Sequence, residues 1–579
     1  MKLNHNDLQS FEELPQRWTV TTLGAILPLT YGKALKKETR DESGMVPVYG
    51  SSGQVGVHSN ALTKKPALIV GRKGSVGEVY RSPVPCWPID TVYFVEERDD
   101  CDLKYFEHLL KGLRLSKLDK STAVPGLSRD DYNAVEVAVA PLDQQKRIVA
   151  EIEKQFSRLD EAVANLKRVK ANLKRYKAAV LKAAVEGRLV ETEAELARKE
   201  GRSLPTPRPG VFYAYAIRCV DDSIYVGHTD NLARRWEEHL AGQAADWTKQ
   251  HKPMQIVHYA EYQSRQEAAD REKWLKTGYG RKWIKREIEA GRARQVGYET
   301  GEQLLERILE TRRLLARNAQ ASSQWLARAE QAGGKGKGKY REPGVPDTTD
   351  LPELPEGWVW ATVDQLAAPK PNSITDGPFG SNLKTEHYQE SGPRVIRLQN
   401  IKDGEFADEY AHISPAHFER LRKHEIHAGD LVIASLGDNP PRACIIPPFV
   451  GPAIVKADCI RFKSHSALTV AYLNAALNCQ PTRQRVKSVL HGIGRPRLSL
   501  DEIRAIALPI PPETEQHRIA AEVDRRLSLD REVESQVDAN LLRAERLRQS
   551  ILSSAFLGQL TSVPHIGRTT IAILEGAGS

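Results

Sequence analysis

A stretch in the middle of the chain gathers side chains that suit chemistry at a phosphate group. Tyr213, Tyr215 and Tyr225 supply phenols, which both donate and accept hydrogen bonds. Arg235 is permanently charged, and its planar fork matches phosphate oxygens. His239 follows four residues later, so a helix would place it on the same face as Arg235. Together these residue types favour phosphodiester hydrolysis.

The elements that must position these side chains can be predicted from the surrounding pattern. Apolar and aromatic runs on either side of an Asp-Asp-Ser turn indicate a hairpin, and Thr-Asp-Asn then caps a helix. A further strand and a helix follow. We expect one strand at 211–217, a second that begins at 224 and a third at 255–262. The expected helices are 232–240 and 264–277.

The order of these motifs resembles the GIY-YIG nuclease domain, in the compact form whose first triad reads Tyr-x-Tyr. Here the two triads are Tyr213-Ala214-Tyr215 and Tyr225-Val226-Gly227. The family's arginine, histidine and glutamate correspond to Arg235, His239 and Glu272. The asparagine that the family carries further on has no clear counterpart in this sequence.

The resemblance implies a role for each residue. Glu272 would hold one Mg²⁺ ion that keeps several of its waters. Arg235 would bind the phosphate, and Tyr225 would act as general base, which requires a pKa below the usual value of about 10. His239 would assist proton transfer, and Tyr215 would position water or phosphate. The alternative for the tyrosines is ordinary packing in a hairpin.

A long internal repeat surrounds this stretch. Leu127 corresponds to Leu498 and Gly187 to Gly558, both at an offset of 371 with no gap between them. Each half also opens with a similar segment, LPQRW ending at Trp18 and LPEGW ending at Trp358. The chain is therefore predicted to consist of two like halves in the same order.

Each half ends in a predicted long helix. In the first, Leu159, Leu166, Leu173 and Val180 recur every seven residues, which is typical of a coiled coil. A helix from 142 to 186 would be roughly 65–70 Å long, too long for a compact core. We expect the two helices to pair antiparallel and to separate two globular heads. The alternative is that each helix pairs in trans with a partner subunit.

This frame resembles the specificity (S) subunit of Type I restriction–modification systems. The resemblance is carried by the LPxxW-like segments and by the PLxxQxxI-type helix starts at Pro141–Ile148 and Pro511–Ile519. It implies two target-recognition domains, each reading one half of a split sequence in double-stranded DNA. It also implies methyltransferase (M) subunits and motor-endonuclease (R) subunits as partners.

Several side chains in the two heads have the chemistry needed to read base edges. Arginine matches guanine, and asparagine or glutamine matches adenine. The alternative for each candidate is an ordinary solvated surface residue. The candidates are Arg72, Lys73, Arg397, Gln399, Asn400, Arg495 and Arg497.

The composition agrees with a DNA-binding protein. The net charge is +9 over 579 residues, which favours a polyanionic partner. Six scattered cysteines form no CxxC pair, so reduced thiols are expected. The first residues have no signal-peptide core, and no apolar run is long enough to span a membrane. A cytoplasmic location without a membrane partner is therefore expected.

The predicted fold is α+β and multidomain: two α/β target-recognition domains, long antiparallel coiled-coil helices and a small inserted GIY-YIG α/β domain. The expected parts are a first target-recognition domain (1–140), a first spacer helix (141–203), the insert (204–297), a helical connector with a basic linker (298–349), a second target-recognition domain (350–510), a second spacer helix (511–561) and a tail (562–579).

The leading functional prediction is a recognition subunit for a bipartite DNA target that also carries a Mg²⁺-dependent endonuclease. Two alternatives stay open at this point. In one, the insert is catalytically inactive and the chain only recognises DNA. In the other, the chain is a free-standing endonuclease that its two heads direct to DNA.

Overall fold

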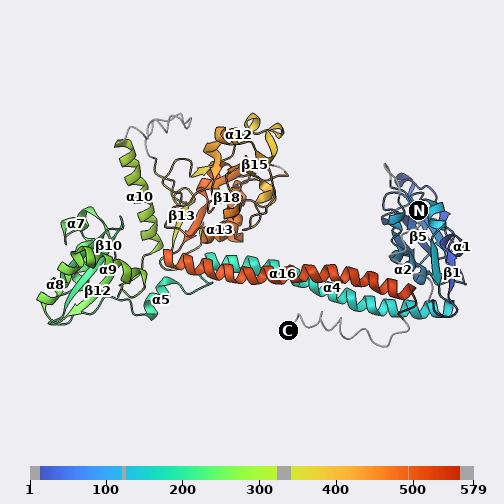
Figure 1. Cartoon of the computed structure of the whole chain (residues 1–579), viewed down its shortest axis with the longest axis horizontal. Helices are drawn as coiled ribbons and strands as arrows, with labels where there is room; N and C mark the ends of the chain where they lie inside the picture. The colour runs from blue at the N-terminus through green and yellow to red at the C-terminus, as the bar shows by residue number, and fades with distance from the viewer. Residues whose placement is uncertain (1–13, 120–124, 322–340, 493, 561–579) are drawn as a thin grey trace. The chain divides into compact units, whose positions relative to one another are not determined.

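The computed structural model describes residues 14–119, 125–321, 341–492 and 494–560 (Figure 1). The predicted tail and most of the glycine- and lysine-rich part of the predicted linker lie outside these residues. The chain divides into two compact units, Met1–Leu173 with Glu532–Ser579 and Lys174–Arg531. Each unit holds one globular head and one end of each long helix.

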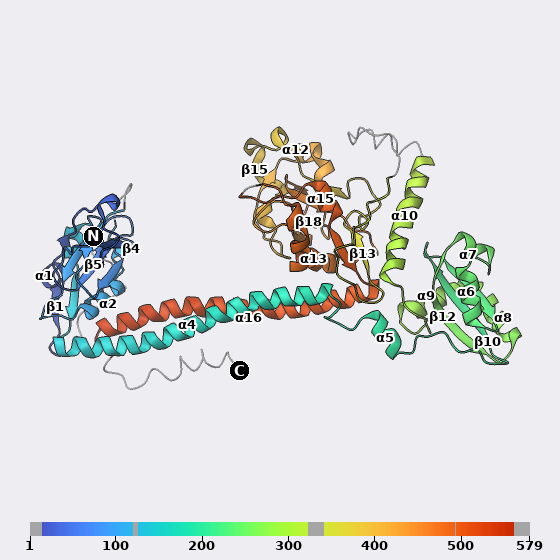
Figure 2. The same cartoon turned by 180° about the vertical axis from the view of Figure 1, so that it is seen from behind.

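The two long helices are α4 (Leu142–Val185) and α16 (Glu513–Phe556), each of 44 residues. In the first unit, Lys170 Nζ lies 2.6 Å from Asp538 Oδ1, and Arg548 forms an ion pair with Asp160. Because the partner's number falls as the residue number rises, the helices run antiparallel. They lie side by side in both views (Figures 1 and 2). The predicted antiparallel pair is thus confirmed, within one chain.

The heptad positions explain why these helices pair. Leu159 and Val180 of α4 are buried, as are Val537, Ala544 and Ile551 of α16. The remaining leucines of the α4 stripe are half-buried. An apolar stripe at this spacing is buried only when a second helix covers it.

Each long helix is followed by a glycine, at a position where a residue with a Cβ would fit poorly. Gly187 has φ +67° and Gly558 has φ +74°, in the left-handed region. A Cβ on Gly187 would lie 2.5 Å from Pro355 Cγ, and one on Gly558 would lie 2.2 Å from Pro15 Cγ. The glycine that closes one copy of the repeat therefore packs on the leading segment of the other copy.

The leading tryptophans attach each head to the start of a long helix. Trp18 donates its Nε1–H to Gln144 Oε1 at 2.8 Å, and Trp358 donates to Glu515 Oε1 at 3.0 Å. These pairs occupy equivalent positions in the two copies. The repeat in the sequence is therefore also a repeat of contacts.

The first head has a four-stranded sheet in the order β2-β8-β5-β6, a three-stranded sheet β4-β3-β7 and a strand pair β1-β9. Its core includes Tyr105 and Phe106, and Phe556 from the end of α16 also packs there. The bounds are β1 Thr19–Thr22, α1 Leu23–Ile26, β2 Thr30–Tyr31, β3 Val46–Gly50, β4 Gly53–His58, β5 Ala67–Gly71, β6 Val79–Ser82, β7 Trp87–Pro88, β8 Val92–Glu96, α2 Leu103–Leu113, α3 Arg129–Asn133 and β9 Glu136–Val139.

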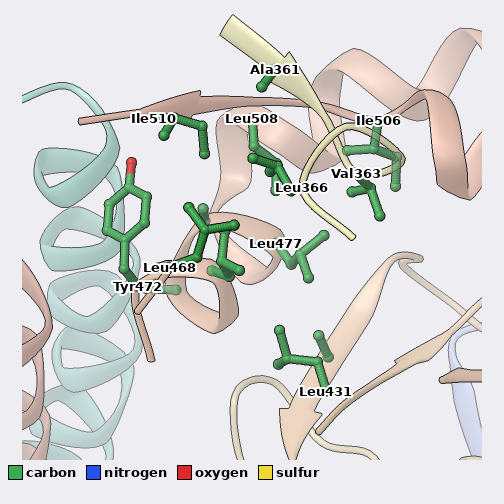
Figure 3. Close-up of a cluster of buried hydrophobic side chains, with 14 of the residues drawn as sticks. Ala361, Val363, Leu366, Leu431, Leu468, Tyr472, Leu477, Ile506, Leu508 and Ile510 are labelled. Atoms are coloured by element: carbon green, nitrogen blue, oxygen red, sulfur yellow. The ribbon is translucent and has the colours of Figure 1, made fainter. Parts of the chain in front are cut away.

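The second head has sheets in the orders β14-β21-β18-β19 and β16-β15-β20-β17, with the pair β13-β22. Figure 3 shows part of its core, where Tyr472 and Leu477 lie beneath Leu508 and Ile510. The bounds are β13 Val359–Thr362, β14 Ile374–Thr375, β15 Tyr388–Ile396, β16 His412–Ile413, α12 Pro415–Arg420, β17 Glu425–Ile426, β18 Leu431–Ala434, β19 Arg442–Ile445, β20 Ala453–Val455, β21 Cys459–Phe462, α13 Val470–Asn478, α14 Gln480–Arg485, α15 Leu500–Ala505 and β22 Ala507–Ile510.

The part of the chain between the two copies of the repeat forms a three-stranded antiparallel sheet in the order β11-β10-β12, with helices packed on it. The bounds are α5 Glu193–Lys199, β10 Phe212–Cys219, β11 Ile224–Thr229, α6 Leu232–Leu240, α7 Asp246–Gln250, β12 Pro253–Tyr262, α8 Arg265–Lys276, α9 Gly278–Glu289 and α10 Gly301–Ala321. The Gly297 N–H donates to the Arg202 carbonyl at 2.8 Å, so the two ends of this domain meet. Meeting ends are expected of a domain inserted into an existing connection.

All six cysteines are buried and free, as the sequence predicted. Among the residues that the structure describes, no helix combines the length and the apolar character needed to cross a membrane.

The glycine that ends α4 gives a direct test of the contact between the two copies. We expect Gly187→Ala to lower the thermal midpoint more than Gly201→Ala. Gly201 shares the left-handed backbone (φ +62°) but has nothing within 4 Å of an added Cβ. Backbone strain should lower the free energy of unfolding of both variants by about 1 kcal/mol. The clash with Pro355 should lower that of Gly187→Ala by about 1–3 kcal/mol more. Equal midpoints for the two variants would contradict the packing described here.

Candidate active site

Four of the five predicted catalytic side chains meet around one hydroxyl group. Tyr215 is buried in the central strand β10, and its Oη lies 2.8 Å from His239 Nε2. Arg235 donates from Nε to the same hydroxyl at 3.3 Å. The Tyr225 ring lies against the His239 ring, with centroids 4.9 Å apart. The sequence spacing therefore brings Tyr215, Tyr225, Arg235 and His239 together.

The hairpin β10–β11 makes this cluster possible. Tyr215 pairs directly with Gly227 across the two strands. A Cβ on Gly227 would lie only 2.5 Å from the Tyr215 hydroxyl oxygen. The glycine of the second triad therefore leaves the space in which the Tyr215 side chain crosses its neighbour.

Helix α6 supplies the arginine and the histidine. The Asn231 side chain accepts from the Arg234 N–H at 3.0 Å and begins the helix. Arg235 and His239 then lie one turn apart on the same face. The Arg235 guanidinium also donates to Glu238 Oε2 at 2.7 Å, a partner that the sequence did not predict.

His239 is held as a neutral ring. It is fully buried, and its Nδ1 lies 2.9 Å from Thr248 Oγ1. Burial, assisted by the nearby charge of Arg235, lowers the pKa of His239 to about 4. At neutral pH the imidazole is therefore uncharged, with one nitrogen able to accept a proton and the other able to donate one. The ring joins Tyr215 to Thr248 in one polar chain.

Tyr215 keeps its proton. Burial raises the pKa of Tyr215 above its ordinary value, and the hydrogen bond from Arg235 only partly opposes this. This phenol can hold a ligand by hydrogen bonding but is unsuited to act as a base. Tyr213, in the same strand, is buried with its ring 6.3 Å from that of Tyr259, so it packs in the core.

Glu272 lies on α8, which packs on the hairpin. Its carboxylate is hydrogen-bonded to His228 of β11 and to Lys276 on the next turn of α8. Burial acts to raise the pKa of Glu272, but these two hydrogen bonds outweigh burial and hold the pKa below its ordinary value. The carboxylate is therefore ionised at neutral pH.

The donor set around Glu272 bears on the expected Mg²⁺. Within the described ranges, no cluster of three or more histidine, cysteine, aspartate or glutamate side chains could hold a metal. A single carboxylate still fits Mg²⁺, because this ion keeps several waters and takes further ligands from substrate phosphates. Lys276 would have to turn away from Glu272 for such an ion to bind.

Sequence reasoning missed His228 and a basic face beside Glu272. From 273 to 286 the sequence has no acidic residue, and six basic side chains there are exposed. Arg271 links α8 to α9, since its guanidinium carbon lies 4.1 Å from the Trp274 ring centre and 4.4 Å from the Trp283 ring centre. The run of basic residues from 273 to 286 is the sequence signal that could have predicted this face. The basic face consists of Lys273, Lys276, Arg281, Lys282, Lys285 and Arg286.

The predicted DNA-reading residues of the first head lie on a loop after β5. Arg72 donates to the Asp90 carbonyl at 2.9 Å, and its guanidinium lies 5.2 Å from the Tyr31 ring centre. Lys73 is exposed beside it. Both side chains are therefore placed where a ligand can reach them.

In the second head the predicted residues separate into two groups. Arg397 and Gln399 lie near one another, where Gln399 is exposed and donates to Glu409 Oε2 at 2.5 Å. Arg495 and Arg497 are exposed on another loop.

Asn400 corrects one prediction. Its side chain is fully buried, and its amide donates to the carbonyls of Ala407 and Glu409, each at 2.8 Å. Its Oδ1 accepts from the Arg397 N–H at 2.9 Å. Since these bonds hold the loop together, Asn400 has a structural role and no access to a base edge.

The geometry defines a class: a nuclease-type domain, built around a tyrosine–histidine–arginine network, inserted between two like heads. Comparison with known families agrees. Residues 211–285 match the GIY-YIG catalytic domain, and residues 15–175 match the Type I restriction modification DNA specificity domain. The chain therefore carries a Type I restriction modification DNA specificity domain, followed by a GIY-YIG domain.

Two kinds of curated relatives match different parts of the chain. The specificity subunit of the Type I restriction enzyme EcoDI of Escherichia coli is 27% identical over 224 residues, which is 37% of this chain and 44% of that subunit. The match thus spans less than half of that relative. A UPF0213 protein of Haloquadratum walsbyi is 38% identical over 65 residues, which is 11% of this chain and 73% of that protein.

Two solved structures align with the chain at low similarity. The S subunit from M. genitalium aligns with a TM-score of 0.30 and 13% identity, over 95% of this chain and 98% of that one. The HsdS subunit from Thermoanaerobacter tengcongensis aligns with a TM-score of 0.34 and 12% identity, over 94% and 98%.

The buried histidine gives a pH-dependent prediction. The unfolded chain protonates His239 near pH 6.5, whereas the folded domain protonates it only near pH 4. The contribution of neutral His239 to the free energy of unfolding is therefore fully present above pH 6.5 and is lost as the pH falls towards 4. We expect ¹³C-histidine NMR to show a signal that titrates near pH 4 and is missing in His239→Gln. A His239 signal that titrates near 6.5 would refute its burial as a neutral ring.

Proposed function

We propose that the chain is the DNA-specificity subunit of a Type I restriction–modification complex and reads a bipartite target. The observation that carries this proposal is the doubled head. The sheets β2-β8-β5-β6 and β14-β21-β18-β19 have the same strand order, and each head holds the end of a long helix from the other copy. Two like heads on one chain suit a target with two separate parts.

The partners follow from this assignment. The long helices would fix the spacing of the two half-sites in double-stranded DNA. M subunits would methylate the bound sequence, and R subunits would supply translocation and cleavage in the full complex, all in the cytoplasm. The match to a specificity subunit supports these partners by analogy.

We further propose that the insert is a Mg²⁺-dependent DNA endonuclease. Arg235 would bind the scissile phosphate, since its charge is permanent and lies at the centre of the cluster. Tyr215 would donate a hydrogen bond to a phosphate oxygen or to the attacking water. Bound at Glu272, Mg²⁺ would neutralise charge on the phosphate and the leaving oxygen.

The proton of the attacking water would pass to Tyr225 as the phosphorus–oxygen bond breaks. A phenol serves as a base near neutral pH only if a positive charge stabilises its ionised form. Arg235 is the cation of this cluster. His239, which is neutral, would assist proton transfer by holding the Tyr215 hydroxyl in position, and Thr248 would fix the other side of its ring.

The basic face beside Glu272 supports DNA as the substrate. Lys273 and Lys276 are ion-paired to Asp270 and Glu272, and the exposed side chains of Arg281, Lys282, Lys285 and Arg286 add positive charge that attracts a phosphate backbone whatever its sequence. Recognition by the heads and attack by the insert would then use different surfaces.

One observation favours an inactive insert as the second candidate. The Glu272 carboxylate is hydrogen-bonded to both His228 and Lys276, so Mg²⁺ must displace the Lys276 ammonium group to reach it. In that case the basic face would act only as a clamp on DNA.

Substitution of the glutamate separates these candidates. With Mg²⁺, the purified protein should nick or cut plasmid DNA, and Glu272→Gln should reduce the rate at least about hundredfold without weakening DNA binding. Asp270→Asn, an exposed carboxylate on the same helix, is the matched control and should cut normally. Equal cutting by Glu272→Gln would refute the assigned site. No cutting by the wild type would leave the clamp as the function of the insert.

A further inference from the structure

The two heads can be aligned residue by residue from their hydrogen bonds. Leu127 donates its N–H to the Arg72 carbonyl at 2.9 Å, and the equivalent Leu498 donates to the Ser435 carbonyl at 2.8 Å. Arg72 and Ser435 therefore occupy the same place, each just after the strand that lies third in its four-stranded sheet.

The strand at the edge of each sheet follows the same register. Thr30 pairs with Phe94 on β8, and Thr375 pairs with Arg461 on β21. Tyr31 and Asp376 are then equivalent, and a glycine follows each. A Cβ on Gly32 would lie 2.0 Å from the Ile89 carbonyl oxygen, and one on Gly377 would lie 2.3 Å from that of Lys456. The backbone at this edge is thus closely alike in both heads.

The side chains at this shared place differ. In the first head, two arginines lie near the Tyr31 ring, with Arg72 at 5.2 Å and Arg129 at 5.3 Å from its centre. In the part of the chain that the structure describes, neither arginine forms an ion pair with a carboxylate. We name this group, Tyr31, Arg72 and Arg129, the first cluster.

The second head carries a different set. Arg497 lies 5.9 Å from the Phe379 ring centre and forms an ion pair with Asp458 at 2.8 Å. Asp376, in the place of Tyr31, accepts from the Asp458 N–H at 3.0 Å. We name Phe379, Asp458 and Arg497 the second cluster. The first cluster has two cations and no acid, whereas the second pairs its cation with an acid.

The aromatic rings of both clusters are accessible to a ligand. Tyr31 is 48% exposed and Phe379 is 50% exposed, and Arg129 is exposed as well. Both clusters lie at an isolated β-bridge. In the first head it joins Lys73, after β5, to Gly126, before α3; in the second head it joins Leu436, after β18, to Arg497, before α15.

We propose that this place is where each head reads bases, so that the differing clusters give the two half-sites different sequences. The inference rests on the proposed DNA-recognition function. The arginine forks of the first cluster suit the O6 and N7 acceptors of guanine, although one Arg72 nitrogen already donates to the Asp90 carbonyl. The Asp458 carboxylate in the second cluster suits an exocyclic amino donor, such as that of cytosine, beside the Arg497 fork.

The test is selection of bound duplexes from a randomised library by the full-length protein, followed by affinity measurements on the selected sites. Arg129→Ala and Arg72→Lys should each weaken discrimination at one half-site about tenfold or more and leave the other half-site unchanged. Arg497→Ala should affect only the other half-site. Lys65→Ala, which removes an exposed charge from the first head, is the control and should change neither.

The outcomes separate this inference from the function on which it rests. If the wild type selects no two-part sequence, the recognition function fails and the inference fails with it. If the wild type does select one but all three arginine variants keep its preferences, the inference alone fails. A uniform loss of affinity for every sequence would mean that the clusters contact phosphates, and this too would overturn base reading.

Discussion

The antiparallel packing of α4 on α16 is the contact on which the rest of the structure depends. Because the helices run in opposite directions, the end of α16 reaches the first head and the end of α4 reaches the second. Phe556 packs in the core of the first head, and Val180 and Ala184 pack in that of the second. Neither head has a complete core without a helix from the other copy of the repeat, so duplication and folding are coupled.

The same arrangement leaves room for an added domain. Parts of the connection between the copies pack in the core of the second head, through Leu189, Leu304 and Ile308, and the ends of the insert meet through the hydrogen bond from Gly297 to Arg202. The insert has its own sheet and its own buried clusters, around Tyr215 and around Leu275. Its polar network is therefore built from local sequence, whereas the heads are built from segments far apart in the chain.

This difference decides what could be predicted from sequence. The positions of Arg235 and His239 on one helix face, and the pairing of the hairpin, follow from short spacings. The left-handed glycines that end α4 and α16 follow from the repeat. The role of Asn400 could not be predicted, because its partners are carbonyls that only the folded loop brings to it. His228 was missed because Glu272 lies on a different element, and strand β2, with two residues, is too short to carry a periodic signal.

The proposed recognition function requires one chain to read two half-sites at a fixed separation. Its most direct test is binding to duplexes in which the spacer between the selected half-sites is lengthened. Adding five base pairs turns one half-site about half a turn around the DNA axis, so affinity should fall to that of a duplex with a single half-site. Affinity that does not change with spacer length would contradict the account.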